Sequence, residues 1–322
     1  MFRQAADTVQ LHNAVVVLLS TARSIEAGQM QRIDAHIHLW DTAQLDYPWH
    51  QRGSFPGLPD TYLLDDAIKD AGGTEIAFIA VQAEVDHTKD PVEETAWIQT
   101  IADEHPNGDR IAGFVAYADL CRPDLPDVLE RHARHTVFRG VRQELWWQKS
   151  SPRPDILEED LLSNSAWREG FGALAGIDAS FDLTCWHTQL HPFAAFLADY
   201  PTIPVIVDHM GSPIAGDDAA LDVWLDGIKA LAVLPNTFMK VSGLSQADAH
   251  WTVVSIRPLV DRVLEVFGPE RCMLGSNFPI EKLTSPYETV WAAYEALFRD
   301  LSPEDKDALC FSTTKRAYRL GQ

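Results

Sequence analysis

The feature that most restricts the fold of this chain is a repeated alternation between short apolar runs and longer amphipathic segments. The apolar runs have the length of buried strands, and the segments that follow them have the spacing of helices with one buried face. Several runs are continuously apolar, as expected for strands that are covered on both faces of a parallel sheet. The runs lie at residues 32–39, 75–84, 111–120, 137–145, 179–186, 203–211, 236–244 and 271–279.

Each of these runs is followed by a segment that we predict to be helical, and a short helix is expected to close the chain. Eight strand–helix units favour an α/β fold of the (β/α)8 TIM-barrel type over an open sheet. No GxGxxG or GxxxxGK[ST] motif follows any run, which weakens the nucleotide-binding alternatives. The expected helices lie at residues 61–71, 91–105, 123–135, 164–177, 191–200, 218–233, 253–268 and 285–301, with the closing helix at 313–320.

The length of 322 residues fits one barrel domain with an extension, because barrels commonly need ~200–250 residues. Residues 1–30 contain only a six-residue apolar core, AVVVLL, which is too short for a signal peptide or a membrane span. We therefore expect residues 1–30 to be a loose extension outside the fold, and residues 31–322 to form a single (β/α)8 domain.

The chain is strongly acidic, with 26 Lys and Arg against 47 Asp and Glu and a formal charge of -21. Such a surface repels phosphate backbones and anionic membranes, so we expect neither nucleic acid nor membrane as a partner. A small-molecule substrate is expected instead, and self-association into a homo-oligomer is left open. The four cysteines form no CxxC pair and predict buried thiols in a reducing, cytoplasmic setting. They are Cys121, Cys185, Cys272 and Cys310.

The first apolar run, RIDAHIHLW, carries His36 and His38 two residues apart. Side chains at i and i+2 of a strand point to the same face, with Cα atoms about 6.5 Å apart. The pair could therefore give two ligands to one divalent ion, or two hydrogen-bond donors to one oxygen. Taken alone, the pattern is better explained by two histidines that each bond to nearby backbone, so the pair needs support from the rest of the chain.

Polar residues gather at the carboxyl ends of the other predicted strands, which is where catalytic groups lie in a barrel of this kind. Histidines scattered through a core would not show that bias, so the joint pattern favours a site at this end of the barrel. The residues are Gln82, Glu84, Asp86 and His87; Arg142, Gln143 and Glu144; Trp186 and His187; Asp208 and His209; Lys240 and Ser242; and Asn277.

At these strand ends the sequence resembles a known family. DAHIHLWD followed by YPW, then GVRQ, VDHMGSP, LGSNFP and KRAYRL are similar to the amidohydrolase-related hydrolases of the amidohydrolase 2 type. The branch with sugar lactonases and 2-pyrone-4,6-dicarboxylate lactonase is the most similar. The resemblance covers the chain from Arg32 to Leu320. It implies a barrel hydrolase that opens a lactone, with a sugar-acid lactone as the expected substrate.

Carried over to this chain, the resemblance implies that His36, His38 and His209 bind a divalent ion or polarise the scissile carbonyl directly. It implies that Arg142 binds a substrate carboxylate or hydroxyl, for which an always-charged guanidinium is suited. An ion pair of Arg142 with Glu84 or Glu144 inside the barrel mouth is the structural alternative. Gln82 is expected to contact the substrate from the neighbouring strand.

Asn277 departs from the family pattern, which usually has GSDWP where this chain has GSNFP. The family's aspartate takes the proton from the attacking water, and a neutral amide cannot do so near neutral pH. We expect another carboxylate to be the base, with Glu84 preferred, then Glu144 and then Asp208. A helix-capping role for Asn277 is the alternative to a catalytic one.

The metal is a second open question. His187 could fill the strand-5 position at which many metal-binding members have a histidine, although a slip of one residue would turn it towards the barrel wall. Zinc, the most plausible ion, generally takes three protein ligands and water. We slightly favour metal-independent polarisation by imidazoles whose second nitrogen is fixed by a neighbour. Asp34 and Asp208 are expected to point into the helix layer rather than at these imidazoles.

Trp146 and Trp147 follow the fourth strand and could form an aromatic wall for a sugar ring or planar lactone. For Trp147 we favour pinning of the loop. Two other functions would also agree with the sequence. One is a metal-dependent decarboxylase of the same superfamily, and the other is a catalytically silent barrel that binds a ligand and has lost its base at Asn277.

Overall fold

The computed structural model describes residues 32–148, 157 and 159–321. The predicted extension at residues 1–30 lies outside the described residues, so the expectation that it is loose stays a prediction. Everything that follows concerns the described part of the chain.

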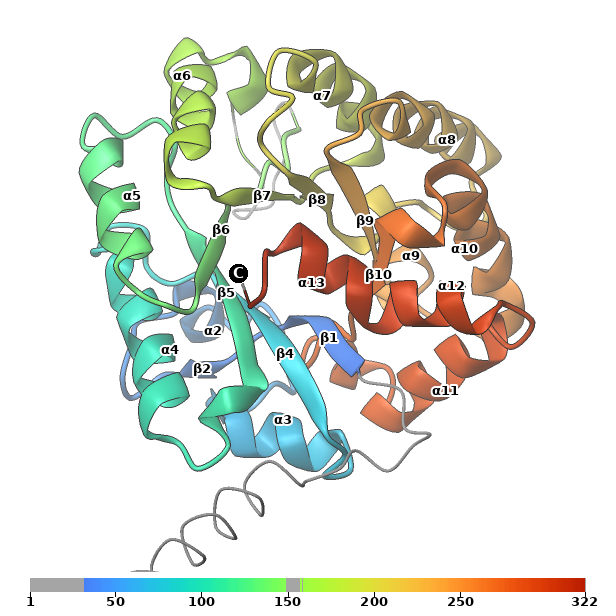
Figure 1. Cartoon of the computed structure of the whole chain (residues 1–322), viewed down its shortest axis with the longest axis horizontal. Coiled ribbons are helices and arrows are strands. Elements are labelled where there is room, and N and C mark those ends of the chain that lie inside the picture. The colour runs from blue at the N-terminus through green and yellow to red at the C-terminus, as the bar shows by residue number, and fades with distance from the viewer. Residues whose placement is uncertain (1–31, 149–156, 158, 322) are drawn as a thin grey trace, which may run out of the picture. The chain divides into compact units, whose positions relative to one another are not determined.

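Within the described residues, eight parallel strands form one sheet in sequence order, which confirms the predicted (β/α)8 TIM barrel (Figure 1). A parallel bridge between Ile37 and Phe278 brings the last strand segment back to the first. The strands are β1 (Arg32–Ile37), β4 (Ile76–Val81), β5 (Ile111–Tyr117), β6 (Phe138–Arg142), β7 (Ser180–Leu183), β8 (Val205–Val207), β9 (Thr237–Val241) and β10 (Cys272–Leu274).

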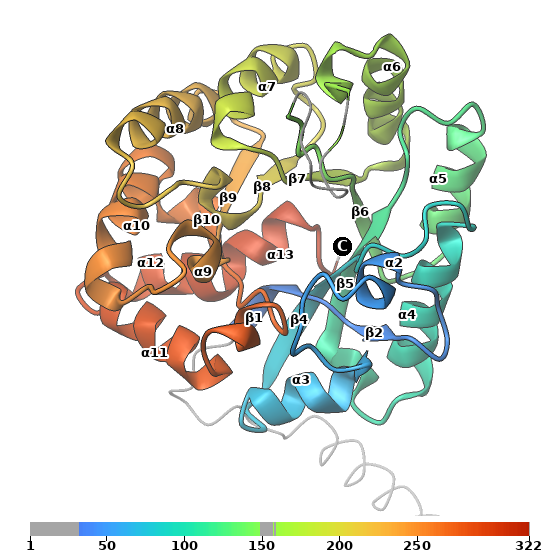
Figure 2. The ribbon, with the colours of Figure 1, turned by 180° about the vertical axis from the view of Figure 1, so that it is seen from behind.

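A helix follows each strand and lies on the outside of the barrel, as Figures 1 and 2 show from its two ends. These helices are α3 (Leu64–Asp70), α4 (Val92–Glu104), α5 (Leu125–Ala133), α6 (Ser165–Ala173), α7 (Leu190–Leu197), α8 (Asp218–Ala232), α10 (Val253–Phe267) and α11 (Tyr287–Leu297). Small elements interrupt the loops, namely β2 (Trp40–Asp41), α2 (Pro48–Gln51), β3 (Thr61–Tyr62) and α9 (Leu244–Ala247).

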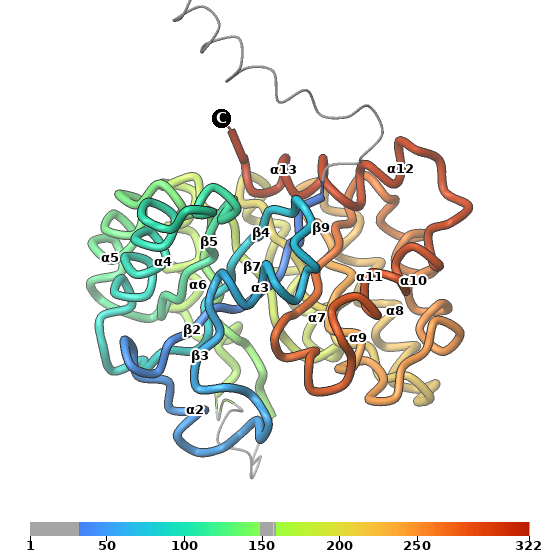
Figure 3. Tube along the Cα trace, turned by 90° about the horizontal axis from the view of Figure 1, so that it is seen from below, coloured from blue at the N-terminus to red at the C-terminus, as the bar shows by residue number. Residues whose placement is uncertain are grey.

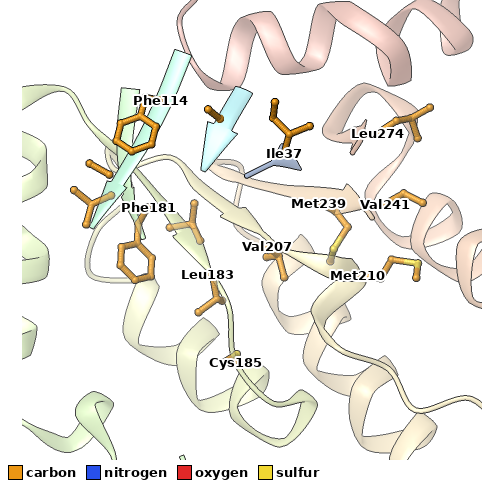
Figure 4. Close-up of a cluster of buried hydrophobic side chains, with 14 of the residues drawn as sticks. Ile37, Phe114, Phe181, Leu183, Cys185, Val207, Met210, Met239, Val241 and Leu274 are labelled. Carbon is orange, nitrogen blue, oxygen red and sulfur yellow. The ribbon is translucent and has the colours of Figure 1, made fainter. Parts of the chain in front are cut away.

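Alternate side chains of the strands pack on opposite sides of the sheet. One buried cluster lies between strands and helices, and Figure 4 shows part of it, including Phe181, Val207 and Met239. A smaller cluster fills the barrel interior and includes Ile79, Val115 and Ile206. The barrel is therefore a packed core below the site rather than a pore.

The end of the barrel opposite the loops of α2 is covered by the C-terminal segment (Figure 3). This segment contains α12 (Pro303–Asp307), a π-helical turn at Ala308–Ser312 and α13 (Thr313–Ala317). The fully buried Tyr318 follows α13 and packs with the interior cluster. The predicted closing helix is thus confirmed, and it brings an aromatic side chain into the barrel.

Two expectations drawn from composition can also be compared with the structure. None of the four cysteines is disulfide-bonded, but only Cys185 and Cys272 are buried, while Cys121 and Cys310 are half-buried. The prediction of four buried thiols was therefore wrong for two of them. In the described part of the chain, no helix combines the length and the apolar character that a membrane span requires.

Candidate active site

His36 lies in β1 and His38 directly follows Ile37, the last residue of that strand. The pairing of β1 with β4 shifts register between Asp34 and Ile37, around His36. Nε2 of His36 lies 3.2 Å from Nε2 of His38, and both side chains are buried. Nδ1 of His38 lies 3.0 Å from the carbonyl oxygen of Val81 and 3.1 Å from that of Gln82. Since carbonyls only accept, His38 carries its proton on Nδ1.

His209 joins this pair from the loop after β8. Its ring centroid lies 4.6 Å from that of His36, and its Nδ1 lies 2.9 Å from Oγ of Ser242. Burial lowers the pKa of His38 to about 3 and that of His209 to about 4. The predicted convergence of the three imidazoles is therefore present, and all three are neutral at neutral pH because burial also lowers the pKa of His36.

A buried charge network lies directly beneath the histidines. The ammonium Nζ of Lys240 lies 2.6 Å from Oδ2 of Asp182, 3.0 Å from Oδ1 of Asp208 and 3.1 Å from Nδ1 of His36. Asp208 also accepts a hydrogen bond of 2.8 Å from Thr184. The expectation that Asp208 faces the helix layer was wrong, because alternation along the strand places it on the inward face with Ile206.

Arg142 lies at the end of β6 between two carboxylates. Its Nη1 is 3.6 Å from Oε1 of Glu144, its Nη2 is 4.0 Å from Oε1 of Glu84, and Nη2 donates a 2.9 Å hydrogen bond to the carbonyl of Gln82. That carbonyl also faces His38, so the guanidinium and the histidine are neighbours. The ion pairs weighed as an alternative are thus present, and they hold Arg142 beside the imidazoles.

The two glutamates differ in their protonation. Burial raises the pKa of Glu144 to about 7, and the nearby charge of Glu84 adds to the effect. Burial acts on Glu84 too, but the hydrogen bond and charge of His87 and the charge of Arg142 outweigh it and lower its pKa to about 2. Both side chains keep contact with solvent, at 29% and 30% exposure, so water and substrate can reach them.

Gln82 holds Glu84 in place rather than pointing freely at a substrate. Its side-chain oxygen accepts a 2.6 Å hydrogen bond from the backbone N–H of Glu84, and its Nε2 donates to the Glu84 carboxylate. Glu84 has a left-handed backbone with φ of 56°. On its other side, Glu84 pairs at 3.1 Å with His87, which stacks on Tyr117. Both polar ends of the Gln82 side chain are thereby used.

Asn277 lies where β10 returns to β1. Its backbone N–H donates a 2.8 Å hydrogen bond to the carbonyl of His36, and its φ is 59°. Asp34 supports the same junction by accepting hydrogen bonds from the backbone N–H groups of His36 and Ser276 and from the hydroxyl of Tyr287. Asp34 therefore faces the helix layer as predicted, and Asn277 is buried beside His36.

Aromatic side chains that follow β6 and β7 contact one another. The ring of Trp146 packs edge-on against that of Trp186, with centroids 4.4 Å apart. Trp147 forms a β-bridge with Leu157, which agrees with the favoured role in pinning the loop. His187 begins a short 3-10 turn and is half-buried. Among the described residues, no recorded hydrogen bond or ring contact joins His187 to the three histidines.

The residues do not make a good metal site. The described parts of the chain contain no group of three or more His, Cys, Asp or Glu side chains arranged to hold an ion. His36, His38 and His209 were the expected ligands, but Nδ1 of His36 faces the Lys240 ammonium, and Asn277 provides no carboxylate. A buried cation next to a prospective ligand disfavours a second cation there.

The sequence did not predict that Lys240 and Asp182 form an ion pair close to the site. Side chains at every second position of a strand share a face. In TFMKV and SFDL this alternation places Lys240 and Asp182 on the inward face of the barrel. Charged residues in such buried runs need a partner of opposite sign. The sequence did not reveal which residues pair, because that depends on the stagger between strands.

The sequence model of the amidohydrolase family matches residues 33–320. An L-fucono-1,5-lactonase of Burkholderia multivorans is 31% identical over 303 residues, which is 90% of this chain and 96% of that protein. A Sinorhizobium fredii protein, named only as uncharacterized protein y4mH, is 34% identical over 89% of this chain and 98% of its own length.

Solved structures agree with these sequence matches. A crystal structure of an amidohydrolase from Burkholderia multivorans with bound zinc has a TM-score of 0.75 and 31% identity, over 90% of this chain and 99% of that one. A putative 2-pyrone-4,6-dicarboxylic acid hydrolase from Pseudomonas putida, at 18% identity and a TM-score of 0.67 over 91% of this chain and 99% of that one, shares the fold. The family match extends over nearly the whole barrel, and this chain belongs to the amidohydrolase family of hydrolases.

Proposed function

We propose that this hydrolase opens a lactone, with a sugar-acid lactone as the substrate, by attack of water on the ring ester carbonyl. The observation that carries the proposal is the meeting of three neutral imidazoles with Arg142 and a carboxyl of raised pKa at the barrel mouth. The relatives named as L-fucono-1,5-lactonases support the choice of a sugar lactone.

In this proposal, Glu144 replaces the missing aspartate as general base. A base is most effective when its pKa lies near the working pH, and the pKa of Glu144, raised to about 7, meets that condition. The low pKa of Glu84 makes it a weak base, so we now prefer Glu144 to Glu84. Asp208 is the least suitable of the three, because it is buried against Lys240.

The reaction then needs two proton transfers. Glu144 takes one proton from water as the hydroxyl oxygen bonds to the carbonyl carbon. The carbonyl oxygen becomes an oxyanion, which the Arg142 guanidinium, the ring N–H of His209 and the Nε2–H of His36, turned from His38 to the substrate, stabilise. His38 does not donate to it, because its N–H is bonded to the carbonyls of Val81 and Gln82. When the bond from that carbon to the ring oxygen breaks, the protonated Glu144 returns the proton to the leaving oxygen, and a hydroxy acid is released.

The remaining candidates are assigned supporting roles. Glu84 fixes one side of Arg142, and Gln82 fixes Glu84. Trp146 provides an apolar face at the rim of the site, and His187 is the weakest substrate-binding candidate. Asn277 holds the β10 end against His36.

The test is a screen of aldonolactones that follows acid release with a pH indicator. We expect turnover of at least one sugar lactone, and at least a ~100-fold loss in His36→Ala and His209→Ala, as when an oxyanion donor is removed. His191→Ala, at an exposed histidine on α7, is the matched control and should keep full activity. Undiminished turnover in the first two variants would reject the assigned site.

The same experiment separates the rival functions. Release of carbon dioxide from an aromatic acid, without lactone turnover, would support the decarboxylase. Tight lactone binding without turnover, together with activity gained in Asn277→Asp, would support the silent binding barrel.

A further inference from the structure

Lys240 is a charged residue with no exposure to solvent. Its ammonium group has three N–H donors and no acceptor. Three polar atoms surround it: Oδ2 of Asp182 at 2.6 Å and Nδ1 of His36 at 3.1 Å accept hydrogen bonds, and Oδ1 of Asp208 at 3.0 Å forms an ion pair. Because the ammonium can only donate, Nδ1 of His36 must be the acceptor in their hydrogen bond.

This contact determines where the proton of His36 lies. A neutral imidazole that accepts at Nδ1 carries its proton on Nε2. Nε2 of His36 lies 3.2 Å from Nε2 of His38, which is an acceptor because His38 donates from Nδ1 to the carbonyls of Val81 and Gln82. The hydrogen bonds then run in one direction, from Lys240 to His36 to His38 to the backbone.

The opposite tautomer would create a different site. Nδ1 of His36 also lies 3.3 Å from Oδ1 of Asp208, and donation to this oxygen would leave both Nε2 lone pairs facing each other. Two imidazoles on one tetrahedral zinc ion have their nitrogens about 3.3 Å apart, since each Zn–N bond is ~2.0–2.1 Å. In the described structure, however, the contact from Lys240 to Nδ1 of His36 is the shorter of the two, at 3.1 Å, and has hydrogen-bond geometry, whereas His36 and Oδ1 of Asp208 lie 3.3 Å apart as an ion-pair contact.

We propose that Lys240 is a positioning residue that keeps His36 in the Nε2–H tautomer and thereby closes the His36–His38 pair to a divalent cation. The site carries its own buried cation in place of a metal. The inference rests on the proposed lactone hydrolysis only for its kinetic readout, and its other two readouts are independent of the substrate.

The test uses a variant that removes the cation without leaving a surplus of buried charge. Lys240→Met alone would strand Asp182 and Asp208, so the main variant is Lys240→Met combined with Asp182→Asn. The control is Tyr318→Phe, which removes the 2.6 Å hydrogen bond from Tyr318 to Asp182 but leaves Lys240 in place. Folding of each variant is checked by circular dichroism.

The first readout is the tautomer of His36, observed by NMR of protein with 15N-labelled histidine and assigned by the signals lost in His36→Gln. We expect Nε2–H in the wild type and in Tyr318→Phe, and Nδ1–H in the double variant. An Nδ1–H tautomer in the wild type would overturn the proposal, and this measurement does not depend on any variant of Lys240.

The second readout is the affinity for zinc alone, measured by calorimetry. We expect zinc to bind the double variant at least ~10–100-fold more tightly than the wild type or Tyr318→Phe, the range over which partners of metal ligands change affinity. Equal zinc affinity in all three proteins would also overturn the proposal.

Kinetics complete the test. Without added metal, the double variant should lose kcat for the lactone with KM changed less than threefold, because the donor is misdirected rather than the pocket lost. A change confined to KM would contradict a positioning role. If no lactone is turned over by any protein, the proposed function fails, while the tautomer and the zinc affinities still decide the role of Lys240.

Discussion

Glu144 and Glu84 flank the same guanidinium, yet their pKa values move in opposite directions. Burial raises the pKa of Glu144 to about 7, whereas His87 and Arg142 lower that of Glu84 to about 2. A general base works only when it is ionised. If Glu144 is the base, kcat/KM should therefore fall about tenfold per pH unit below pH 7 and level off above it. A profile that stays flat down to pH 5 would indicate Glu84 instead.

Substitution separates the two carboxylates further. Glu144→Gln should lower kcat by ~10²–10⁴-fold, the usual contribution of a general base. Glu84→Gln should retain more activity and shift the acid limb of kcat/KM to lower pH, because the charge of Glu84 helps to raise the pKa of Glu144. An acid limb that does not move in Glu84→Gln would contradict the coupling between the two groups.

Asn277 offers a test of whether the base has changed position in this chain. It lies beside His36, at the position where the resemblance to the pattern GSDWP implies a carboxylate. We expect Asn277→Asp to restore at least tenfold activity when added to Glu144→Gln. The same substitution in the wild type should change kcat by less than threefold, as measured by initial rates. No recovery in the double variant would mean that position 277 cannot reach the attacking water.

At the residue level, the sequence predicted His36, His38, His209 and Arg142 because the rule that sites lie at strand ends requires no knowledge of register. It did not predict the orientation of Asp208, nor the choice between Glu84 and Glu144. Both depend on which charges meet inside the barrel, such as Lys240 with Asp208, and on how deeply each group is buried.

At the level of elements, the closure between β10 and β1 depends on one side chain. Asp34 accepts hydrogen bonds from two backbone N–H groups and from Tyr287. Asp34→Ala should lower the free energy of unfolding by about 3 kcal/mol or more, since each buried donor without a partner costs ~1–3 kcal/mol. Asp34→Asn keeps one acceptor oxygen and should lose about half as much. Urea unfolding at pH 8 measures both, and equal losses would contradict the role of the oxygen acceptors.

The C-terminal segment is a second element whose contribution is testable. Tyr318 fills the end of the barrel opposite the site and donates a hydrogen bond to Asp182. Tyr318→Ala should destabilise the fold by ~3–5 kcal/mol, as for other large aromatic side chains removed from a core. Tyr318→Phe keeps the ring and should cost only about 1–2 kcal/mol. Thermal or urea unfolding distinguishes the two, and an unaffected Tyr318→Ala would show that the segment does not seal the barrel.

The strand and helix order was the most predictable part of these elements, because apolar periodicity is a local signal. Helix ends were less predictable. The closing helix, expected at 313–320, ends at Ala317, and a π-helical turn at Ala308–Ser312 precedes it. The irregularity of β1 between Asp34 and Ile37 was not predicted either, since it arises from pairing with β4 rather than from the residues of β1 alone.

For the whole molecule, the charge of -21 has a kinetic consequence. A lactone substrate is neutral, but the hydroxy acid that it yields is an anion, which the acidic surface repels. Screening shortens this repulsion to about 10 Å at 0.1 M salt. Raising the salt from about 20 mM to 300 mM should therefore strengthen product inhibition severalfold and change kcat/KM for the lactone less than twofold. Weaker product inhibition at high salt would indicate that attraction to Arg142 dominates.

Three of the candidate site residues share a backbone feature. Glu84, His209 and Asn277 all have positive φ, between 52° and 59°, a conformation that suits glycine better than a residue with a side chain. Each of these side chains is therefore held on a backbone that costs on the order of 1 kcal/mol, and glycine would relieve that cost only by giving up the contacts of the side chain. A library sorted on turnover should keep a side chain at all three positions, even where the backbone alone would favour glycine.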